Sequence, residues 1–177
     1  MRFLSVLILF ISINGFAQTT DLKLQNAIVV AQLDKAEDRF TMEINLTEML
    51  ASNGVKAIAS LNILKEGSSV ALLANDSIQA VLKEKGFDTY VLVSVRGYDR
   101  KFKPAKNHLN LKEELVSGHM FPFYRDEVSS ISFEFLFYRN GEVVGYDLIK
   151  VAGINKREAA IKKFRKKTAK RIVSNWK

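Results

Sequence analysis

Few side chains in this chain of 177 residues could perform acid–base or hydrolytic chemistry. Asp34 and Asp99 each follow an apolar run, and the two histidines are His108 and His119. A carboxylate at the end of a strand can act as a nucleophile, and histidine titrates near neutral pH. A small hydrolase or ligand-binding protein that uses residues 98–130 is therefore one hypothesis for the function.

Metal and nucleotide chemistry are not indicated by the spacing of residues. The histidines lie outside any H-x-x-x-H or His–Cys pattern, and the chain contains no cysteine. No glycine occurs between Ala27 and Asn53, and the phosphate-binding pattern G-x-x-x-x-G-K-S/T is absent. We expect no cofactor and no metal. Asp34 is more simply explained as the start of a helix, in a capping box with Glu37.

The strongest charge feature is the carboxyl-terminal segment. Residues 156–177 contain ten Lys or Arg and one acidic residue, whereas the rest of the chain contains 17 basic and 18 acidic residues. Asn155 and Glu158 predict a capped helix start. Apolar residues then follow at helical spacing, which predicts an amphipathic helix: Ile161, Phe164, Thr168, Ile172 and Trp176. The basic side chains occupy its remaining surface: Lys162, Lys163, Arg165, Lys166, Lys167, Lys170 and Arg171.

The amino terminus predicts the compartment. Arg2, an apolar run over residues 3–13 and small residues before Gln18 have the layout of a secretory leader. We predict a signal peptide over 1–17, cleavage between Ala17 and Gln18, and a mature single domain over 18–177. No cysteine follows the cleavage site to carry a lipid, and no second apolar run is of membrane length. The mature protein is thus expected to be periplasmic or secreted, without a transmembrane segment.

The mature chain alternates strand and helix patterns. Strands are predicted over 26–34, 55–64 and 87–97, and helices over 34–54 and 77–86, which favours a parallel sheet covered on both faces. In the helix over 34–54, Phe40, Ile44, Thr47 and Leu50 recur at helical spacing. Residues 131–152 alternate about Asn140-Gly141, the strongest short-range signal for a hairpin. Counting outward from that turn places Phe135 opposite Tyr146, and Glu134 opposite Asp147.

The expected fold is therefore an α/β three-layer sandwich with a mixed sheet. A βαβαβ parallel core is followed by an antiparallel β-hairpin at the sheet edge and a C-terminal amphipathic helix. Residues 98–130 form a long connection with a helical turn over 109–116, and connections of this length are usually functional or mobile. Its first residues combine charge and aromatic character and are candidate contact residues: Tyr98, Arg100, Lys101, Phe102 and Lys103.

The pattern resembles a group of small, uncharacterised envelope proteins and lipoproteins of Gram-negative bacteria. The wider relatives are the TolB amino-terminal domain, the curli-secretion channel subunit and the lipoprotein activators of peptidoglycan synthases. The resemblance covers residues 26–97 and 131–176, and rests on these positions: Arg39, Glu43, Leu46, Leu50, Gly54, Val55, Ala57, Ala59, Ser60, Gly86, Asp88, Val91, Leu92, Val93, Lys166, Ala169, Lys170, Arg171, Ile172 and Val173. It implies an α/β domain used for protein–protein contact. The missing lipid-bearing cysteine departs from the lipoprotein members.

These observations favour a non-catalytic periplasmic accessory or adaptor domain that binds another cell-envelope component, either a protein or an anionic component. The contact residues would be those of the 98–103 segment and the lysines of the last helix: Lys162, Lys163, Lys166, Lys167 and Lys170. Peripheral membrane association through the same helix is a further alternative. Nucleic acid is not expected, because a secreted chain does not normally meet it and Phe164 and Trp176 belong to the apolar stripe.

Overall fold

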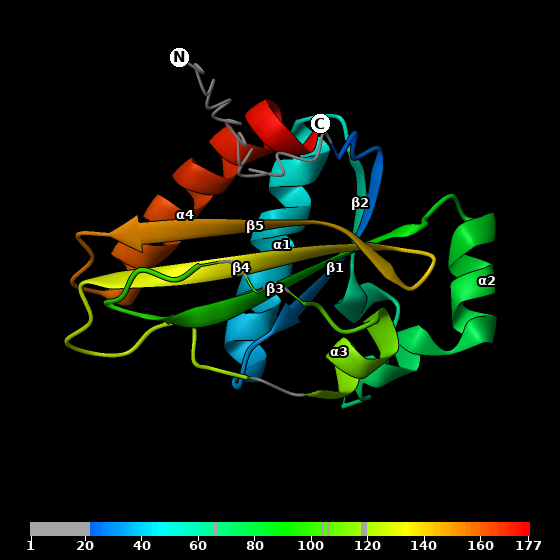
Figure 1. Cartoon of the computed structure of the whole chain (residues 1–177), viewed down its shortest axis with the longest axis horizontal. Helices are drawn as coiled ribbons and strands as arrows, with labels where there is room; N and C mark the ends of the chain where they lie inside the picture. The colour runs from blue at the N-terminus through cyan, green and yellow to red at the C-terminus, as the bar shows by residue number, and fades with distance from the viewer. Residues whose placement is uncertain (1–21, 66, 104, 106, 118–119) are drawn as a thin grey trace, which may run out of the picture.

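The computed structural model describes residues 22–65, 67–103, 105, 107–117 and 120–177. Within them the chain forms a mixed sheet of five strands in the order β2-β1-β3-β4-β5 (Figure 1). β1 pairs in parallel with β2 and β3, whereas β4 pairs antiparallel with β3 and β5. The strands are β1 (Asn26–Gln32), β2 (Lys56–Ala59), β3 (Thr89–Tyr98), β4 (Ser130–Arg139) and β5 (Glu142–Ala152). The predicted leader and its cleavage site lie outside the described residues.

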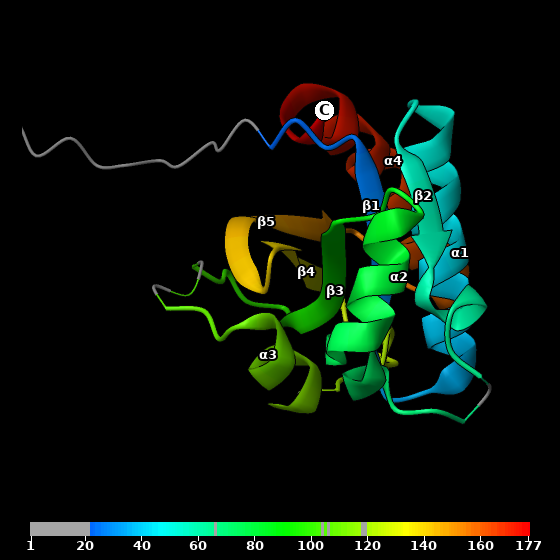
Figure 2. The same cartoon turned by 90° about the vertical axis from the view of Figure 1, so that its right-hand side faces the viewer.

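Helices cover both faces of the sheet (Figure 2). On one face lie α1 (Ala36–Ser52) and α4 (Arg157–Arg171), and on the other lie α2 (Asp76–Glu84) and α3 (Leu111–Ser117). Each side has its own cluster of buried apolar residues, with alternate strand residues belonging to one or the other. The predicted α/β three-layer sandwich is therefore confirmed, with its parallel core, closing hairpin and last helix.

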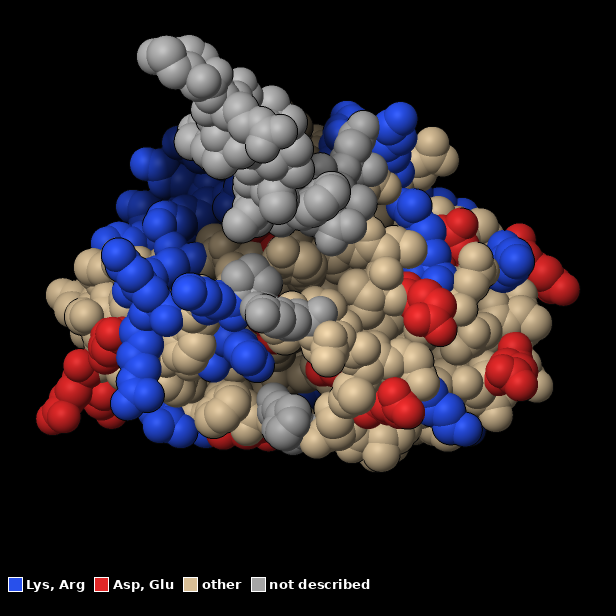
Figure 3. Space-filling view, in the orientation of Figure 1, with Lys and Arg blue, Asp and Glu red and all other residues tan. Residues whose placement is uncertain are grey.

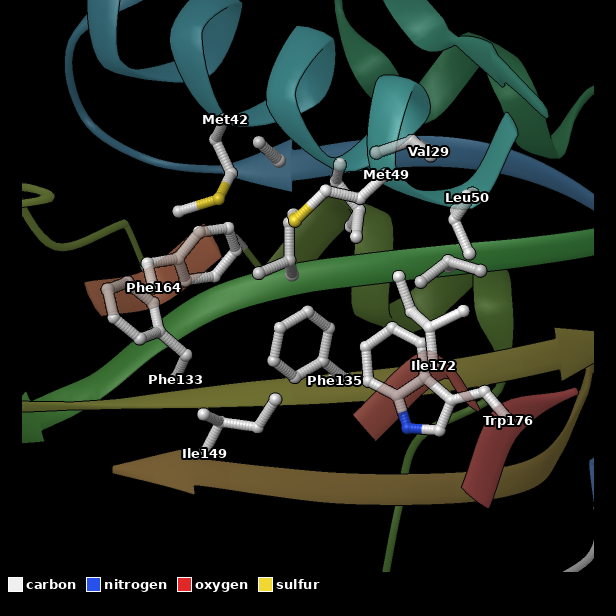
Figure 4. Packing of buried hydrophobic residues seen from close by; sticks show 14 of the residues in the cluster. Val29, Met42, Met49, Leu50, Phe133, Phe135, Ile149, Phe164, Ile172 and Trp176 are labelled. Atoms are coloured by element: carbon white, nitrogen blue, oxygen red, sulfur yellow. The ribbon is translucent and has the colours of Figure 1, made fainter. Parts of the chain in front are cut away.

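An aromatic core joins the hairpin to the last helix (Figure 4). The ring of Phe164 lies 4.9 Å from that of Phe133, and the Trp176 ring lies 4.8 Å from Phe135 and 5.1 Å from Phe137. All five side chains are buried. Edge and tilted contacts of this kind add to the free energy gained by burying apolar surface. The two apolar faces predicted separately, one on the hairpin and one on the helix, pack against each other.

The register predicted for the hairpin is wrong by one residue. Phe137 pairs with Gly145 and Tyr138 with Val143, so Val144 is an extra residue in a β-bulge. The bulge lies where the amino-terminal segment crosses: a Cβ added to Gly145 would come within 2.4 Å of Leu22 Cδ2. From there on, Phe135 faces Asp147 and Glu134 faces Leu148. The expected pair of facing carboxylates therefore does not form.

The predicted helix caps are also wrong. The N-cap residues of α1 and α4 are Lys35 and Lys156, and neither side chain accepts a hydrogen bond from its helix. Acidic residues in the first turns, such as Asp38 and Glu158, remain placed favourably for the helix dipole. The first turn of α4 is instead held by an ion pair between Arg157 and Asp38 of α1.

The face that α1 turns to the sheet differs from the predicted stripe. Met42, Leu46 and Leu50 are buried, whereas Phe40 is 58% exposed. The inner face also includes a fully buried carboxylate, Glu43, which no apolar pattern could indicate. Met42, Glu43 and Leu46 share the inner face of the helix, and Phe40 therefore faces away from the core.

The last turn of the chain is a π-helix over Ile172–Trp176. Its wider turn keeps Ile172 and Trp176 on the same inward face, and both are buried. The amide of Leu24 donates a hydrogen bond to the Trp176 carbonyl at 2.7 Å. The first described residues are therefore tied to the last turn of the chain.

Candidate functional site

The basic residues of α4 divide into rows with different surroundings. Ala160, Phe164 and Thr168 are buried against the sheet. Because residues three and four apart share a helix face, the charged residues fall into rows on either side of this core-facing row and on the side opposite to it. One row faces β5, one faces α1, and one points outward.

The row facing β5 fixes the open edge of the sheet. Lys163 Nζ donates hydrogen bonds to the carbonyls of Ala152 (2.9 Å) and Gly153 (2.5 Å), and Lys167 Nζ donates to that of Lys150 (2.5 Å). β5 is the outermost strand, so these carbonyls have no neighbouring strand as a partner. Covering an edge strand with a helix is a common protection against pairing with another chain. The two lysines have this structural role whatever else they contact.

The three arginines of α4 are all ion-paired within the domain. The nitrogen–oxygen distances are 2.7 Å for Arg157–Asp38, 3.3 Å for Arg165–Glu48 and 3.0 Å for Arg171–Asp147.

The Asp147 carboxylate also accepts hydrogen bonds from the indole N–H of Trp176 and the amide of Leu148. Arg171 and Trp176 are thereby held to β5 by one side chain. The folded domain itself accounts for these arginine charges.

The outward row is different. Lys162, Lys166 and Lys170 are exposed, and among the described residues their side chains have no hydrogen-bond or ion-pair partner. They stand at i, i+4 and i+8, and like charges at this spacing destabilise a helix. Glu158 stands four residues before Lys162, but no acidic residue has this spacing to Lys166 or Lys170. Among the described residues, the outward row is the part of the charge that folding leaves unexplained.

The 98–103 segment lies next to α4 across the end of β5. Arg100, Lys101 and Lys103 are exposed, and Lys150 Nζ donates a hydrogen bond to the carbonyl of Arg100 at 3.4 Å. Lys150 in turn accepts the bond from Lys167 through its own carbonyl. Figure 3 shows basic side chains gathered over the region where Figure 1 places α4 and this end of β5.

The two predicted contact segments are thus brought together. We call this set of residues the basic surface: Arg100, Lys101, Lys103, Lys150, Lys162, Lys163, Lys166, Lys167 and Lys170.

The two aromatic residues of the segment, Tyr98 and Phe102, are half-buried. The Phe102 ring covers Gly97, where an added Cβ would lie 2.3 Å from the ring. The Tyr98 hydroxyl donates to the carbonyl of Pro122, and the guanidinium of Arg125 lies 4.8 Å from the Tyr98 ring. Burial raises the pKa of Tyr98 to about 12, so this donor keeps its proton. In this conformation both residues shape the segment that presents its cations.

The residues of the hydrolase hypothesis have structural contacts. Asp99 accepts hydrogen bonds from the amides and hydroxyls of Ser129 and Ser130, and these bonds lower the pKa of Asp99. The His108 ring packs against Tyr146 at 5.6 Å. Asp34 is exposed beyond β1, and His119 lies outside the described residues. In the described part of the chain, no group of three His, Cys, Asp or Glu could hold a metal ion.

The crevice beyond the carboxyl ends of β1 and β3 is partly filled by the chain. In open α/β sheets this is the usual place for a ligand. Here Leu33 forms a parallel bridge with Phe121, and Phe123, two residues further along the same segment, is buried. The side chain of Arg157 lies over the Phe123 ring at 5.8 Å. This segment occupies space that a nucleotide-type ligand would need.

Glu43 is one of the positions that carry the resemblance, but its sequence pattern predicts no role for it. Its carboxylate accepts hydrogen bonds from the amides of Ala31 (3.0 Å) and Leu61 (3.1 Å) and from the hydroxyl of Ser60 (2.8 and 2.9 Å). Burial raises the pKa of Glu43, against the lowering effect of these hydrogen bonds and of Arg39. The helix contains other acidic residues, such as Glu37 and Glu48, so the sequence carried no signal that singled out Glu43 as buried.

No protein-family model and no curated protein matches the chain. Among solved structures it is similar to the PelC dodecamer from Paraburkholderia phytofirmans, with a TM-score of 0.46 and 12% identity over 85% of this chain and 87% of that chain. For lipoprotein GNA1162 from Neisseria meningitidis the TM-score is 0.44, with 13% identity over 84% of this chain and 97% of that chain. For protein XCC0632 from Xanthomonas campestris the TM-score is 0.40, with 9% identity over 85% of this chain and 79% of that chain.

One of these three structures is that of a bacterial lipoprotein. At this level of similarity we transfer no activity or partner to the present chain. The finer relation to the TolB domain, the curli-secretion channel subunit and the peptidoglycan-synthase activators stays a prediction. None of the helices among the described residues has the length and apolar character needed to cross a membrane.

Proposed function

We propose that this protein is a non-catalytic accessory protein of the cell envelope that binds an acidic partner through the basic surface. The observation that carries the proposal is the outward row of Lys162, Lys166 and Lys170, which repel one another and have no partner among the described residues. An anionic surface laid along this row would remove the repulsion and gain charge-assisted contacts.

The composition of the surface favours an acidic protein or polymer over insertion into a lipid bilayer. Helices that lie in a membrane interface present Trp, Phe or Leu toward the acyl chains. In α4 and the π-helical turn that follows it, the large apolar side chains Phe164, Ile172 and Trp176 are buried in the core. The outward face carries lysine, with exposed Val173 as its apolar exception. Its binding energy would therefore come from charge, and would fall as the salt concentration rises.

The test is site-specific photocrosslinking in the periplasm from position 166, with recovery of partners by mass spectrometry. The matching variant carries Lys162→Glu, Lys166→Glu and Lys170→Glu. Because its position 166 is already changed, the variant and the wild type are compared with the probe at Lys167, and we expect the variant to lose the crosslinked partner. Its control changes the same charge at exposed lysines elsewhere, by Lys83→Glu, Lys85→Glu and Lys112→Glu. Equal loss in both triple variants would mean that net charge, not this surface, determines binding.

Two further measurements separate this function from its alternatives. Sedimentation with vesicles containing anionic lipid should show weak binding that salt abolishes; strong binding that resists salt would favour membrane association instead. The hydrolase hypothesis predicts that His108→Ala together with His119→Ala abolishes function. An accessory protein should retain its partner in that double variant.

A further inference from the structure

A groove on the far side of α1 from α4 has features of a ligand site and is independent of the basic surface. It has a volume of about 720 Å³ and lies between the first turns of α1 and the segment that follows β2. This volume is within the range of small-molecule pockets, roughly 300–1,000 Å³. Its described lining residues are Ala36, Glu37, Arg39, Phe40, Thr41, Ser60, Leu61, Leu64, Lys65, Gly67 and Ser68.

Its walls expose apolar surface that the fold does not use. Phe40 is 58% exposed and Leu61 is 36% exposed, and both line the groove with the half-buried Leu64. Neighbouring exposed apolar side chains around a hollow are typical of a binding site. An apolar ligand would cover Phe40, which the orientation of α1 turns away from the core.

Arg39 supplies a charge with no fixed partner. Its Nε atom is buried, and no described residue accepts a hydrogen bond from it. Arginine in protein interiors is normally paired, because an unpaired buried donor costs about 1–3 kcal/mol. The side chain lines both the groove and a small cavity of about 20 Å³ on its inner side, next to Val70, Leu115 and Met120.

The carboxylates nearby do not satisfy Arg39. Glu43 is close enough for its pKa to be lowered by Arg39, but its oxygens accept hydrogen bonds from Ala31, Ser60 and Leu61. Glu37 lines the groove as an exposed residue, opposed by exposed Lys65. Among the described lining residues, Arg39 is therefore the cation that lies beside the apolar walls with an unsatisfied buried donor.

We propose that this groove binds a monoanionic amphiphile, a carboxylate on a single apolar chain, with Arg39 as its counter-ion and Phe40 and Leu61 as its apolar walls. The guanidinium forks around a carboxylate with two parallel hydrogen bonds. One guanidinium balances the single negative charge of a carboxylate, whereas a phosphate monoester carries nearly two negative charges at neutral pH.

The probe is decanoate, titrated calorimetrically into the full mature chain below its micelle concentration. Decyltrimethylammonium has the same chain with the opposite charge, and decyl phosphate has the larger negative charge. We expect decanoate to bind best and the cation not to bind. Amide chemical shifts should change in residues 36–41 and 60–64 and not in α4. If the cation binds as well as decanoate, or if decanoate does not bind, the proposal is wrong.

Variants test the role of each residue. Arg39→Gln should weaken decanoate binding by about tenfold or more, Arg39→Lys should restore part of it, and Phe40→Ala should weaken it by a few-fold. Arg100→Gln removes the same charge from an exposed position outside the groove, and should leave decanoate binding unchanged. Arg39→Gln removes the favourable charge interaction with Glu43 as well as a buried unsatisfied donor, so its melting temperature is measured beside its affinity for decanoate.

Unchanged decanoate binding in Arg39→Gln would overturn the proposal. If that variant does not fold, Phe40→Ala still tests it, because Phe40 is exposed and contributes little to the core; unchanged binding in Phe40→Ala would then be the contrary result. No residue of the basic surface lines the groove. Failure of the crosslinking experiment would therefore leave the proposal for the groove unaffected.

Discussion

The charged residues of the α1/α4 layer fall into two regions that differ in how their charge is used. On the inner side, Asp38 and Glu43 of α1 and Asp147 of the adjoining strand β5 have fixed partners. Asp38 pairs with a guanidinium, and Glu43 accepts hydrogen bonds from backbone amides and a hydroxyl. Asp147 accepts a hydrogen bond from an indole and pairs with a guanidinium. On the outer side, Lys162, Lys166 and Lys170 have no such partner among the described residues. Inner charges fix the position of the helices, and outer charges remain available to a second molecule.

The choice of side chain follows the same division. Arginine, with a planar group that forms several fixed hydrogen bonds, makes the ion pairs where α4 meets α1 and β5, and Lys163 and Lys167 bond only to carbonyls there. Lysine, whose charge is compact and strongly hydrated, is used on the outer row. Arg39 is the exception, because no described residue accepts a hydrogen bond from its buried Nε, and this is why it points to a ligand.

The largest effect is expected at the contact that holds α4 in place. Trp176→Ala removes a fully buried ring packed on Phe135 and Phe137, and should destabilise the domain by about 3–5 kcal/mol. Chemical denaturation, followed by far-ultraviolet circular dichroism, measures this loss. Val173→Ala, at an exposed position in the same turn, is the control and should have almost no effect. Comparable losses in both variants would remove the distinction between the two sides of the helix.

A buried inner charge should give a characteristic pH dependence. Glu43→Gln puts an amide N–H₂ opposite a backbone donor, and should cost about 1–3 kcal/mol. Because burial raises the pKa of Glu43, its contribution to stability is complete below the ordinary value of 4.5 and is lost as pH rises through the raised pKa. The difference in unfolding free energy between wild type and variant should therefore shrink between acidic and neutral pH. A difference that grows with pH would contradict the assignment.

The ion pairs of α4 should rank by their burial. Arg157 meets Asp38, whose side chain is 8% exposed, whereas Arg165 meets Glu48, which is 57% exposed. We expect Arg157→Gln to lower stability by about 1 kcal/mol or more, and Arg165→Gln to lower it by less than about 0.5 kcal/mol. Thermal unfolding at low and high salt measures both, and the Arg165 pair should depend more on salt. Equal effects would show that solvent exposure does not govern these pairs.

The smallest effect on stability, and one of opposite sign, is expected on the outer row. Replacing Lys162, Lys166 and Lys170 by Gln removes two like-charge pairs and one favourable pair with Glu158, and should raise stability by about 0.2–0.5 kcal/mol. Lys163→Gln with Lys167→Gln is the comparison, because these lysines bond to carbonyls of β5 and should not show this gain. A loss of stability in the triple variant would mean that the outer lysines have a structural role.

Much of the fold could be predicted from local patterns, because strand and helix periodicities and the Asn140-Gly141 turn depend on neighbouring residues. The strand predicted over 55–64 was too long: β2 ends at Ala59, where Ser60 begins a 3₁₀ turn and bonds to Glu43. The register of β5 depends on the crossing of Leu22 over Gly145, a contact between distant parts of the chain. Such long-range contacts have no counterpart in a local pattern.

The basic surface was predictable in composition but not in arrangement. Helical spacing could group the lysines of α4, yet it could not show that Lys163 and Lys167 bond to the edge of β5, or that Lys150 joins them to Arg100. The groove at Arg39 escaped prediction for a related reason. A helical stripe that included Phe40 was as regular as the true one, and the buried carboxylate of Glu43 decided between them.

The hydrogen bond between Leu24 and Trp176 places the two ends of the folded part side by side. The connectivity of the chain can therefore be changed without changing its shape. A short linker from Lys177 to Leu22 would allow new ends at Asn155 and Lys156, both exposed, so that α4 would precede β1 in the polypeptide. Such a circular permutant would still build the same sheet, and it would present the same lysine row from an amino-terminal helix.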